Sequence, residues 1–104
     1  MFARVLRSRM KIDKMDDAAR TFEEDVIPLC RKQRGFEGGY FMGDPKTGES
    51  ITITFWESRE AMIATEQSRF FQEQVAKFIP FYTKPPVREI YDVILKEESG
   101  PLKD

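Results

Sequence analysis

The sequence contains no histidine, and this absence excludes more chemistry than any other feature of the composition. No imidazole is present to act as a general acid or base, to activate a serine or cysteine nucleophile, or to ligate zinc, iron or heme. A site made only of carboxylates could still bind Mg²⁺ or Ca²⁺. However, Asp13, Asp16 and Asp17 lack the glycine and the loop spacing of a calcium-binding hand, so we predict no metal site.

The sequence also has only one cysteine, a net charge close to zero and no long apolar run. Cys30 is the only cysteine, which excludes an internal disulfide and favours a reducing compartment. The formal net charge is −1, so no strong overall field attracts nucleic acid or an anionic membrane. No run approaches the roughly 18 apolar residues that a membrane-spanning helix needs. The basic residues 1–9 lack the apolar core of a secretory signal, so we expect a cytoplasmic protein.

The length and composition that remain are those of one small domain. The chain has 104 residues, of which 40% are hydrophobic and 34% are charged, as in soluble globular proteins. We expect residues 1–96 to form a single domain and residues 97–104 to be a polar C-terminal tail. No internal repeat or linker divides the chain.

The clearest structural signal is the alternation in residues 51–56, which predicts a strand. Side chains alternate along a strand, so one face carries Ile51, Ile53 and Phe55 and the other carries Thr52, Thr54 and Trp56. The preceding residues 44–48 have the composition of a turn. Residues 36–42 are therefore predicted to form a hairpin with this strand, and the glycine pair at 38–39 indicates a bulge.

Two further segments alternate in the same way. Residues 2–10 predict a first strand, in which one set of side chains has the more apolar rhythm and is expected to lie against the helices: Phe2, Arg4, Leu6, Ser8 and Met10. Residues 87–95 predict a fourth strand. The segment 81–86 contains two prolines, so we expect it to be an extended connection before that strand.

Two other segments have the spacing of amphipathic helices. The first begins near Asp13 or Asp16, either of which could cap it, and its apolar residues are Met15, Ala18, Ala19, Phe22, Val26, Leu29 and Cys30. Pro28 interrupts the hydrogen-bond ladder, so we expect a kink or the start of the last turns there. Ser58 is expected to cap the second helical segment, which the polar residues 65–69 could divide in two.

The predicted order is strand, helix, strand, strand, helix, strand. This order is typical of the ferredoxin-like α+β fold, in which two helices cover one face of a four-stranded antiparallel sheet. Both faces of the predicted strands carry apolar side chains, and the chain has no further helix for the second face. We therefore expect a homodimer in which the uncovered sheet faces pack together.

Four short runs of the sequence resemble one known family. They are the run from Pro28 to Tyr40, the run from Ile53 to Ala61, the pair Phe70-Phe71, and Pro85-Pro86-Val87. Together they are similar to the helix–strand joints and the closing section of the antibiotic biosynthesis monooxygenase-like family. The likeness spans roughly residues 2–95. It implies a dimeric α+β barrel with a cavity between the sheet and the helices of each subunit.

The family includes proteins with different activities. Some are oxygenases that need no cofactor and act on polycyclic phenols or quinols, some degrade heme, and many have no known activity. The heme-degrading branch combines a first-strand asparagine, a third-strand tryptophan and a histidine ligand. Trp56 matches the tryptophan, but Arg7 stands nearest to the asparagine position and no histidine exists. The sequence therefore argues against heme degradation.

The resemblance implies a cofactor-independent monooxygenase that acts on an aromatic phenol or quinol. Its candidate catalytic residues are Arg7, with Arg4 as the alternative, to hold a substrate oxyanion, and Tyr40 and Tyr82 to orient a hydroxyl or relay a proton. The candidate ligand-binding residues are Trp56, Phe70 and Phe71, because flat aromatic substrates stack on aromatic walls.

The same residues also allow less specific interpretations. Trp56 could be a core aromatic residue, and Arg7 and Arg9 could be solvated at an edge or interface. The alternative function is therefore a non-catalytic small-ligand-binding protein or a structural homodimer of the same fold. The series Arg4, Arg7, Arg9 on a sheet is distantly similar to RNA binders, but the aromatic and glycine signature of those proteins is missing. We expect no nucleic-acid or membrane partner.

Overall fold

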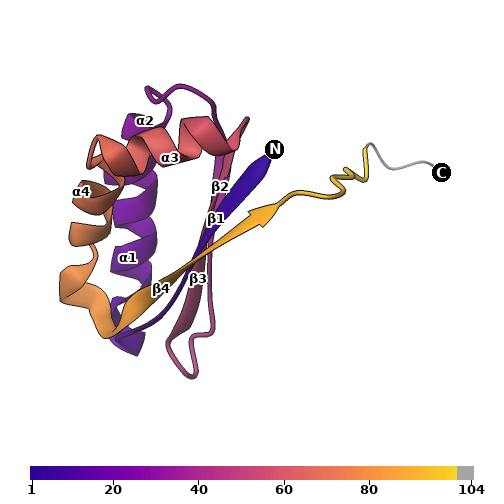
Figure 1. Cartoon of the computed structure of the whole chain (residues 1–104). Coiled ribbons are helices and arrows are strands. Elements are labelled where there is room, and N and C mark those ends of the chain that lie inside the picture. The colour runs from indigo at the N-terminus through magenta and orange to yellow at the C-terminus, as the bar shows by residue number, and fades with distance from the viewer. Residues whose placement is uncertain (101–104) are drawn as a thin grey trace.

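The computed structural model describes residues 1–100 and contains one antiparallel sheet with helices packed on one of its faces (Figure 1). The strands lie in the order β2-β3-β1-β4. The elements in chain order are β1 (Phe2–Met10), α1 (Met15–Thr21), α2 (Ile27–Cys30), β2 (Phe36–Gly43), β3 (Glu49–Trp56), α3 (Arg59–Gln67), α4 (Phe70–Ala76) and β4 (Tyr82–Asp92). This is the ferredoxin-like α+β fold that the sequence predicts, including the β2–β3 hairpin and its bulge near Gly38.

The strand register assigns side chains to the two faces of the sheet. Arg4 in the central strand β1 lies opposite Thr54 of β3 and Ile90 of β4, and its side chain reaches α3. Directly opposed residues share a face, so Thr52, Thr54 and Trp56 of β3 face the helices. The predicted inward set of β1 is confirmed. The more polar face of β3 is the one that the helices cover, and its isoleucines point the other way.

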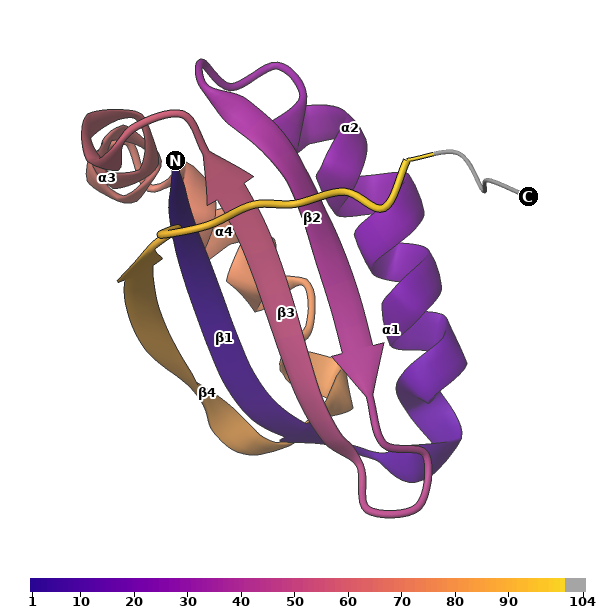
Figure 2. The same ribbon diagram turned by 90° about the vertical axis from the view of Figure 1, so that its right-hand side faces the viewer.

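We call the uncovered side of the sheet the outer face (Figure 2). It carries Ala3, Val5, Arg7, Tyr40, Met42, Ile51, Ile53, Phe55, Val87, Glu89 and Tyr91. Several of its large apolar side chains are exposed, among them Tyr40 and Val87, each with more than half of its surface accessible. The described part of the chain contributes no helix to this face, as expected from the sequence.

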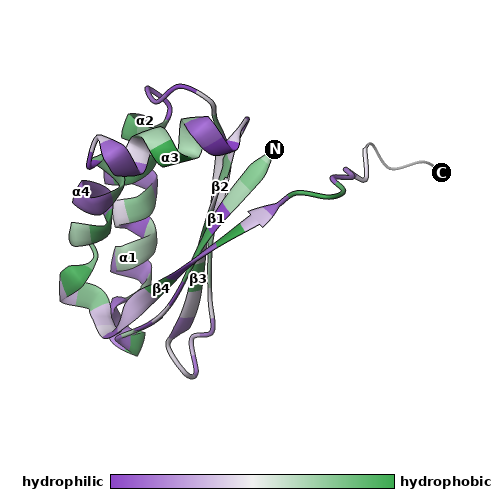
Figure 3. Ribbon diagram, viewed as in Figure 1, coloured by the Kyte–Doolittle hydropathy of each residue, from purple (hydrophilic) through white to green (hydrophobic). Residues whose placement is uncertain are grey.

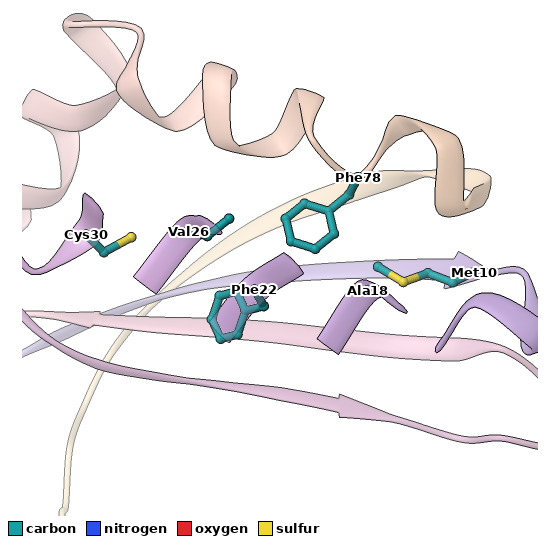
Figure 4. Packing of buried hydrophobic residues seen from close by; sticks show 6 residues of the cluster. All are labelled: Met10, Ala18, Phe22, Val26, Cys30 and Phe78. Atoms are coloured by element: carbon teal, nitrogen blue, oxygen red, sulfur yellow. The ribbon is translucent and has the colours of Figure 1, made fainter. Parts of the chain in front are cut away.

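The hydrophobic core fills the space between the sheet and the helices. Its buried cluster consists of Met10, Ala18, Phe22, Val26, Cys30 and Phe78. Figure 4 shows Ala18, Phe22, Val26 and Cys30 in a row along the first helical segment, with Phe78 pointing toward them from the turn that follows α4. The predicted apolar stripe of this segment is therefore the side that packs into the core.

The first helical segment changes its geometry immediately before Pro28. A π-helical turn, Phe22–Val26, joins α1 to α2. Proline has no N–H, so Pro28 cannot donate a hydrogen bond to the carbonyl four residues earlier, and the widened turn accommodates the missing bond. The expected change of geometry near Pro28 is confirmed.

The predicted caps are confirmed for one helix and wrong for the other. The Ser58 hydroxyl accepts a hydrogen bond from the backbone N–H of Ala61 at 3.1 Å and caps α3. At α1 the capping position is Lys14, and its side chain makes no capping bond. Asp13 lies in a preceding 3₁₀ turn, and Asp16 lies within the first turn of α1, where a carboxylate favours the positive helix end without capping it.

The fourth strand begins earlier than the sequence indicates. It runs from Tyr82 to Asp92, so Pro85 and Pro86 lie inside β4 and not in a connection before it. Among residues 1–100, β4 is an edge strand that pairs only with β1. A proline is tolerated there because the ladder on its free side has no partner to lose. The expected connection at residues 81–86 is therefore wrong, because the position of this strand at the sheet edge allows prolines inside it.

The chain leaves the sheet after Asp92. Figure 3 shows a hydrophobic stretch in this segment, which contains Ile94 and Leu95, and both side chains are largely exposed. In Figure 2 the segment passes in front of the sheet, and in Figure 1 it runs away from the outer face. Residues 101–104 of the predicted tail 97–104 lie outside the described residues. Within residues 1–100, every helix is too short or too polar to cross a bilayer.

Candidate functional site

A buried arginine occupies the centre of the space between the sheet and the helices. Arg4 projects from the central strand β1, and only 5% of its surface is accessible. Its Nη1 donates hydrogen bonds to Thr65 Oγ1 at 3.0 Å and to Glu66 Oε2 at 3.1 Å, both in the last turns of α3. A buried charge needs such partners because an uncompensated one is very costly.

Two aromatic rings complete the surroundings of this guanidinium. Its central carbon lies 3.9 Å from the ring centroid of Phe71 and 5.5 Å from that of Trp56. Both distances are in the range of cation–π attraction. Burial lowers the pKa of Arg4, while the hydrogen bond and charge of Glu66 act in the opposite direction. An arginine starts from so high a pKa that it stays cationic, so Arg4 is a fixed positive charge.

Glu66 forms ion pairs with two arginines, Arg4 and Arg88. Arg88 of β4 donates from Nε to Glu66 Oε2 at 2.8 Å, and its Nη2 lies 2.8 Å from Oε1. Glu66 Oε2 also accepts the bond from Arg4. Two guanidinium groups therefore share one carboxylate, and this cluster keeps a net positive charge next to the core.

Arg4 lines a cavity between the sheet and the helices. The cavity has a volume of about 40 Å³, and mostly apolar side chains surround it. Its lining comprises Arg4, Leu6, Phe22, Val26, Cys30, Thr52, Thr54, Phe70, Phe71, Gln74, Val75, Phe78 and Tyr82. We refer to it as the Arg4 cavity. A few convergent polar groups in an apolar pocket are the usual pattern of a small-molecule site.

Besides Arg4, which the sequence offers as the alternative to Arg7, three of the residues predicted for the site lie at this cavity. Phe70, Phe71 and Tyr82 all line it, although they come from α4 and from the start of β4. Burial raises the pKa of the Tyr82 phenol to about 12, so its hydroxyl remains protonated near neutral pH. Tyr82 is therefore a hydrogen-bond donor at this pH and not a base.

Trp56 lies beside the cavity and does not line it. The side chain is completely buried, and its Nε1 donates a hydrogen bond to Thr54 Oγ1 at 3.0 Å. Its ring meets Phe36 edge to face, with centroids 5.4 Å apart. The indole is therefore a core aromatic residue that contacts the Arg4 guanidinium, and it is not part of the cavity wall.

The other two predicted residues are on the outer face. Arg7 pairs with Glu89, lies mostly exposed, and borders a surface hollow of about 530 Å³ near the β2–β3 turn. Tyr40 is also exposed and packs its ring against Phe55 at a centroid distance of 6.1 Å. The sheet separates both residues from the Arg4 cavity. A role for Arg7 or Tyr40 in a reaction stays a prediction.

Sequence reasoning missed Thr65, Glu66 and Gln74 as members of the site. Gln74 had a usable signal, because it stands four residues from Phe70 and from Phe78 and so falls on the apolar stripe of that segment. Thr65 and Glu66 had none, since they lie in a polar stretch that was interpreted as a helix break. Among residues 1–100, no three acidic or cysteine side chains come together as a metal site would require.

A family model described as antibiotic biosynthesis monooxygenase matches residues 1–77 of this sequence. The chain belongs to the antibiotic biosynthesis monooxygenase family. No curated protein matches the chain in sequence. The family assignment therefore comes from the family model.

Solved structures of other proteins have the same fold as this member of the antibiotic biosynthesis monooxygenase family. A proposed antibiotic biosynthesis monooxygenase from Nitrosomonas europaea is 12% identical, with 91% of this chain and 100% of that chain covered and a TM-score of 0.71. A conserved protein from Methanosarcina mazei Go1 is 14% identical, with 86% and 89% covered and a TM-score of 0.70. At these identities the likeness shows the fold alone.

A third structure carries a ligand. It is a monooxygenase from the gene ActVA-Orf6 of Streptomyces coelicolor in complex with nanaomycin D. That protein is 17% identical to this chain, with 92% of each chain covered and a TM-score of 0.68. Its ligand belongs to that protein, and for the present chain it only motivates a proposal.

Proposed function

We propose that the chain is a cofactor-independent monooxygenase that oxidises an aromatic phenol or quinol in the Arg4 cavity. The observation that carries this proposal is a buried, permanently charged guanidinium beside an aromatic-lined cavity in a member of a monooxygenase family. Such a charge favours the anionic form of a bound phenol. An electron-rich phenolate is the form that reacts with oxygen without a metal or flavin.

The roles follow from the positions of the side chains. Arg4 stabilises the substrate oxyanion, because a fixed positive charge in a water-poor site acts more strongly than in water. Phe70 and Phe71 stack on the ring. Tyr82, which stays protonated, donates a hydrogen bond to a substrate oxygen. Trp56, whose ring centroid lies 5.5 Å from the guanidinium carbon, helps to hold the guanidinium in place.

The overall reaction needs only the phenol and dioxygen. For 1-naphthol, one oxygen atom enters the ring at the position opposite the hydroxyl, and the other leaves as water, giving 1,4-naphthoquinone. The substrate supplies all the electrons that reduce the oxygen. The water takes one hydrogen from the ring carbon that is oxidised and one from the hydroxyl group, so the equation balances without another reductant.

The volume of the cavity limits what can bind without a rearrangement. A space of about 40 Å³ holds a few water molecules at roughly 10–15 Å³ of such volume each, and a bicyclic ring needs more room. Binding therefore requires that Phe70, which is only half-buried, or its helix move outward. If the side chains do not move, the chain is a non-catalytic homodimer of the same fold whose cavity is filled by its own residues.

We also propose that two copies pack through their outer faces. The outer face has exposed apolar side chains, and the segment that follows β4, which contains the exposed Ile94 and Leu95, runs on the same side of the sheet (Figures 1 and 2). Burying apolar surface contributes ~25 cal/mol per Å², so an interface above ~1,000 Å² would stabilise so small a domain considerably. Arg7 and Tyr40 would then be interface residues.

Two matched variants test the location of the site. Arg4→Met and Arg7→Met remove the same charge from the same strand on opposite faces of the sheet. We expect 1-naphthol to raise the melting temperature and to stimulate oxygen uptake with the wild type and with Arg7→Met, and to do neither with Arg4→Met. The reverse pattern would place the site on the outer face. A thermal shift without uptake in the wild type would establish a binding protein, and neither response would establish a structural dimer.

A further inference from the structure

Gln74 is a buried amide with an unpaired oxygen. It lies in α4 with 7% of its surface accessible, and it lines the Arg4 cavity. Its Oε1 atom is buried and accepts no hydrogen bond from any group in the described part of the chain. Leaving a buried acceptor unpaired costs about 1–3 kcal/mol, so most buried polar groups have a partner.

An apolar residue at position 74 would avoid the cost of the unpaired acceptor. The residue stands between Phe70 and Phe78 at four-residue intervals, on the face of the segment that points into the core. Leucine or methionine would fill the same space without an unpaired group. Within residues 1–100, no group donates a hydrogen bond to Gln74 Oε1 and offsets the cost of its burial. A bound molecule in the Arg4 cavity could supply this donor.

Two of the polar residues that line the cavity, Arg4 and Gln74, have opposite hydrogen-bonding preferences. Arg4 is a cationic donor that favours an anionic oxygen, whereas Gln74 Oε1 is an acceptor that needs an O–H or N–H. The side chains of Phe70 and Phe71 also face the cavity and contribute no polar atom. A flat aromatic molecule that carries a hydroxyl group in addition to its oxyanion would satisfy both groups.

We propose that Gln74 is a specificity-determining residue that accepts a hydrogen bond from a second hydroxyl of the bound aromatic ring. This inference rests on the proposed function, because it assumes that the ring binds beside Arg4. It narrows the substrate class from phenols in general to dihydroxylated aromatic compounds. A ring whose second oxygen is methylated leaves Oε1 unpaired and binds more weakly.

Two probes and two variants test the inference. The probes are 1,5-dihydroxynaphthalene and its monomethyl ether, 5-methoxy-1-naphthol, whose dissociation constants are measured without oxygen by calorimetry. Gln74→Met keeps the shape of the side chain and removes the amide. The control is Gln72→Met, because Gln72 is on the same helix and also has a buried, unpaired Oε1 but does not line the Arg4 cavity.

We expect the wild type and Gln72→Met to bind the diol at least about tenfold more tightly than the ether, as loss of one hydrogen bond to a buried acceptor predicts. Gln74→Met should bind the two probes within about twofold of each other. It should also melt no earlier than the wild type, which shows that the lost selectivity does not come from a damaged fold.

The possible failures are distinguishable. If the wild type and Gln74→Met both bind the probes with the same ratio of affinities, the amide has only a solvent partner and the inference about Gln74 is overturned, while the proposed site stands. If no probe binds to the wild type or to either variant, the proposed function fails and the role of Gln74 fails with it.

Discussion

Arg4 and Glu66 connect the middle of the sheet to the end of α3 through a bond of 3.1 Å between Nη1 and Oε2. The two residues are 62 positions apart in the chain. Arg4 is nearly inaccessible, and Glu66 is mostly buried. Glu66 also pairs with the more exposed Arg88. Loss of the Glu66 carboxylate therefore leaves both arginines without their partner, whereas loss of Arg88 leaves the Arg4–Glu66 pair intact.

Glu66→Gln should destabilise the fold strongly. The substitution leaves Arg4 buried without an opposite charge, and breaking a buried pair in this way costs about 3 kcal/mol or more. Arg88→Gln is the control, because it removes a partly exposed partner from the same carboxylate and should cost about 1 kcal/mol or less. Urea denaturation of both variants measures the difference. Equal losses would mean that Arg4 does not depend on Glu66.

Tyr40→Glu should dissociate the dimer that we propose. The side chain lies on the outer face with 62% of its surface accessible, so a single chain tolerates the change. A carboxylate facing an apolar partner surface would be buried without a counter-charge. Ile79→Glu is the control, since Ile79 is 66% accessible and follows α4, away from the outer face.

Sedimentation velocity at micromolar concentration distinguishes the two substitutions. The wild type and Ile79→Glu should sediment as dimers, and Tyr40→Glu should sediment as a monomer with a similar far-ultraviolet circular dichroism spectrum. A wild type that is already a monomer would contradict the proposed assembly. A dimeric Tyr40→Glu would place the interface elsewhere.

Gly48→Ala should destabilise the end of the β2–β3 hairpin. Gly48 has φ +83°, and an added Cβ would lie 2.2 Å from the carbonyl oxygen of Met10, which is backbone and cannot move aside. Gly38→Ala is the comparison, because Gly38 also has a positive φ but an added Cβ would meet nothing within 4 Å. A side chain at a positive φ costs on the order of 1–3 kcal/mol in either variant. Gly48→Ala should cost more, and chemical denaturation measures the excess.

Most of the fold can be predicted because local sequence patterns identify its strands, turns and helices. Alternation located β1 and β3 within a residue or two, and the turn at residues 44–48 defined the hairpin. The start of β4 was missed because the two prolines are acceptable only at a sheet edge, and edge position is a property of the complete sheet. The absent cap at α1 has a similar cause, since the chain enters that helix through a 3₁₀ turn.

The candidate site is harder to predict because it depends on which face of the sheet each side chain occupies and not on the residue type alone. Arg4 and Arg7 are identical residues three positions apart in one strand, which places them on opposite faces. The alternation of β1 supported Arg4 as the inward residue. The choice of Arg7 relied on its place along the strand, although it stands outside the inward set. The positions of Gln74 at the Arg4 cavity and of Glu66 beside Arg4 depend on how α3 and α4 pack against the sheet, which the sequence pattern does not show.

Cys30 should make the stability fall at alkaline pH. Burial raises the pKa of this thiol from 9.0 to about 11, so between these values the unfolded chain releases the proton and the folded chain keeps it. Unfolding is then favoured as the pH rises, and the contribution is lost through the pH range from 9 to 11. From pH 8 to pH 10 we expect this thiol to remove about 1 kcal/mol of unfolding free energy.

Urea denaturation at pH 8 and pH 10, with constant protein concentration, measures this loss for the wild type and Cys30→Ala. Cys30→Ala should start from a lower stability, because it removes buried atoms, but its stability should decrease less between the two pH values. The Tyr82 phenol, whose pKa is also raised by burial, contributes equally in both proteins and cancels in the comparison. The thiol of the folded wild type should also react slowly with Ellman's reagent at pH 8 and rapidly in urea. Parallel pH dependence in the two proteins, or a fast reaction in the folded state, would show that Cys30 is not enclosed by the core cluster.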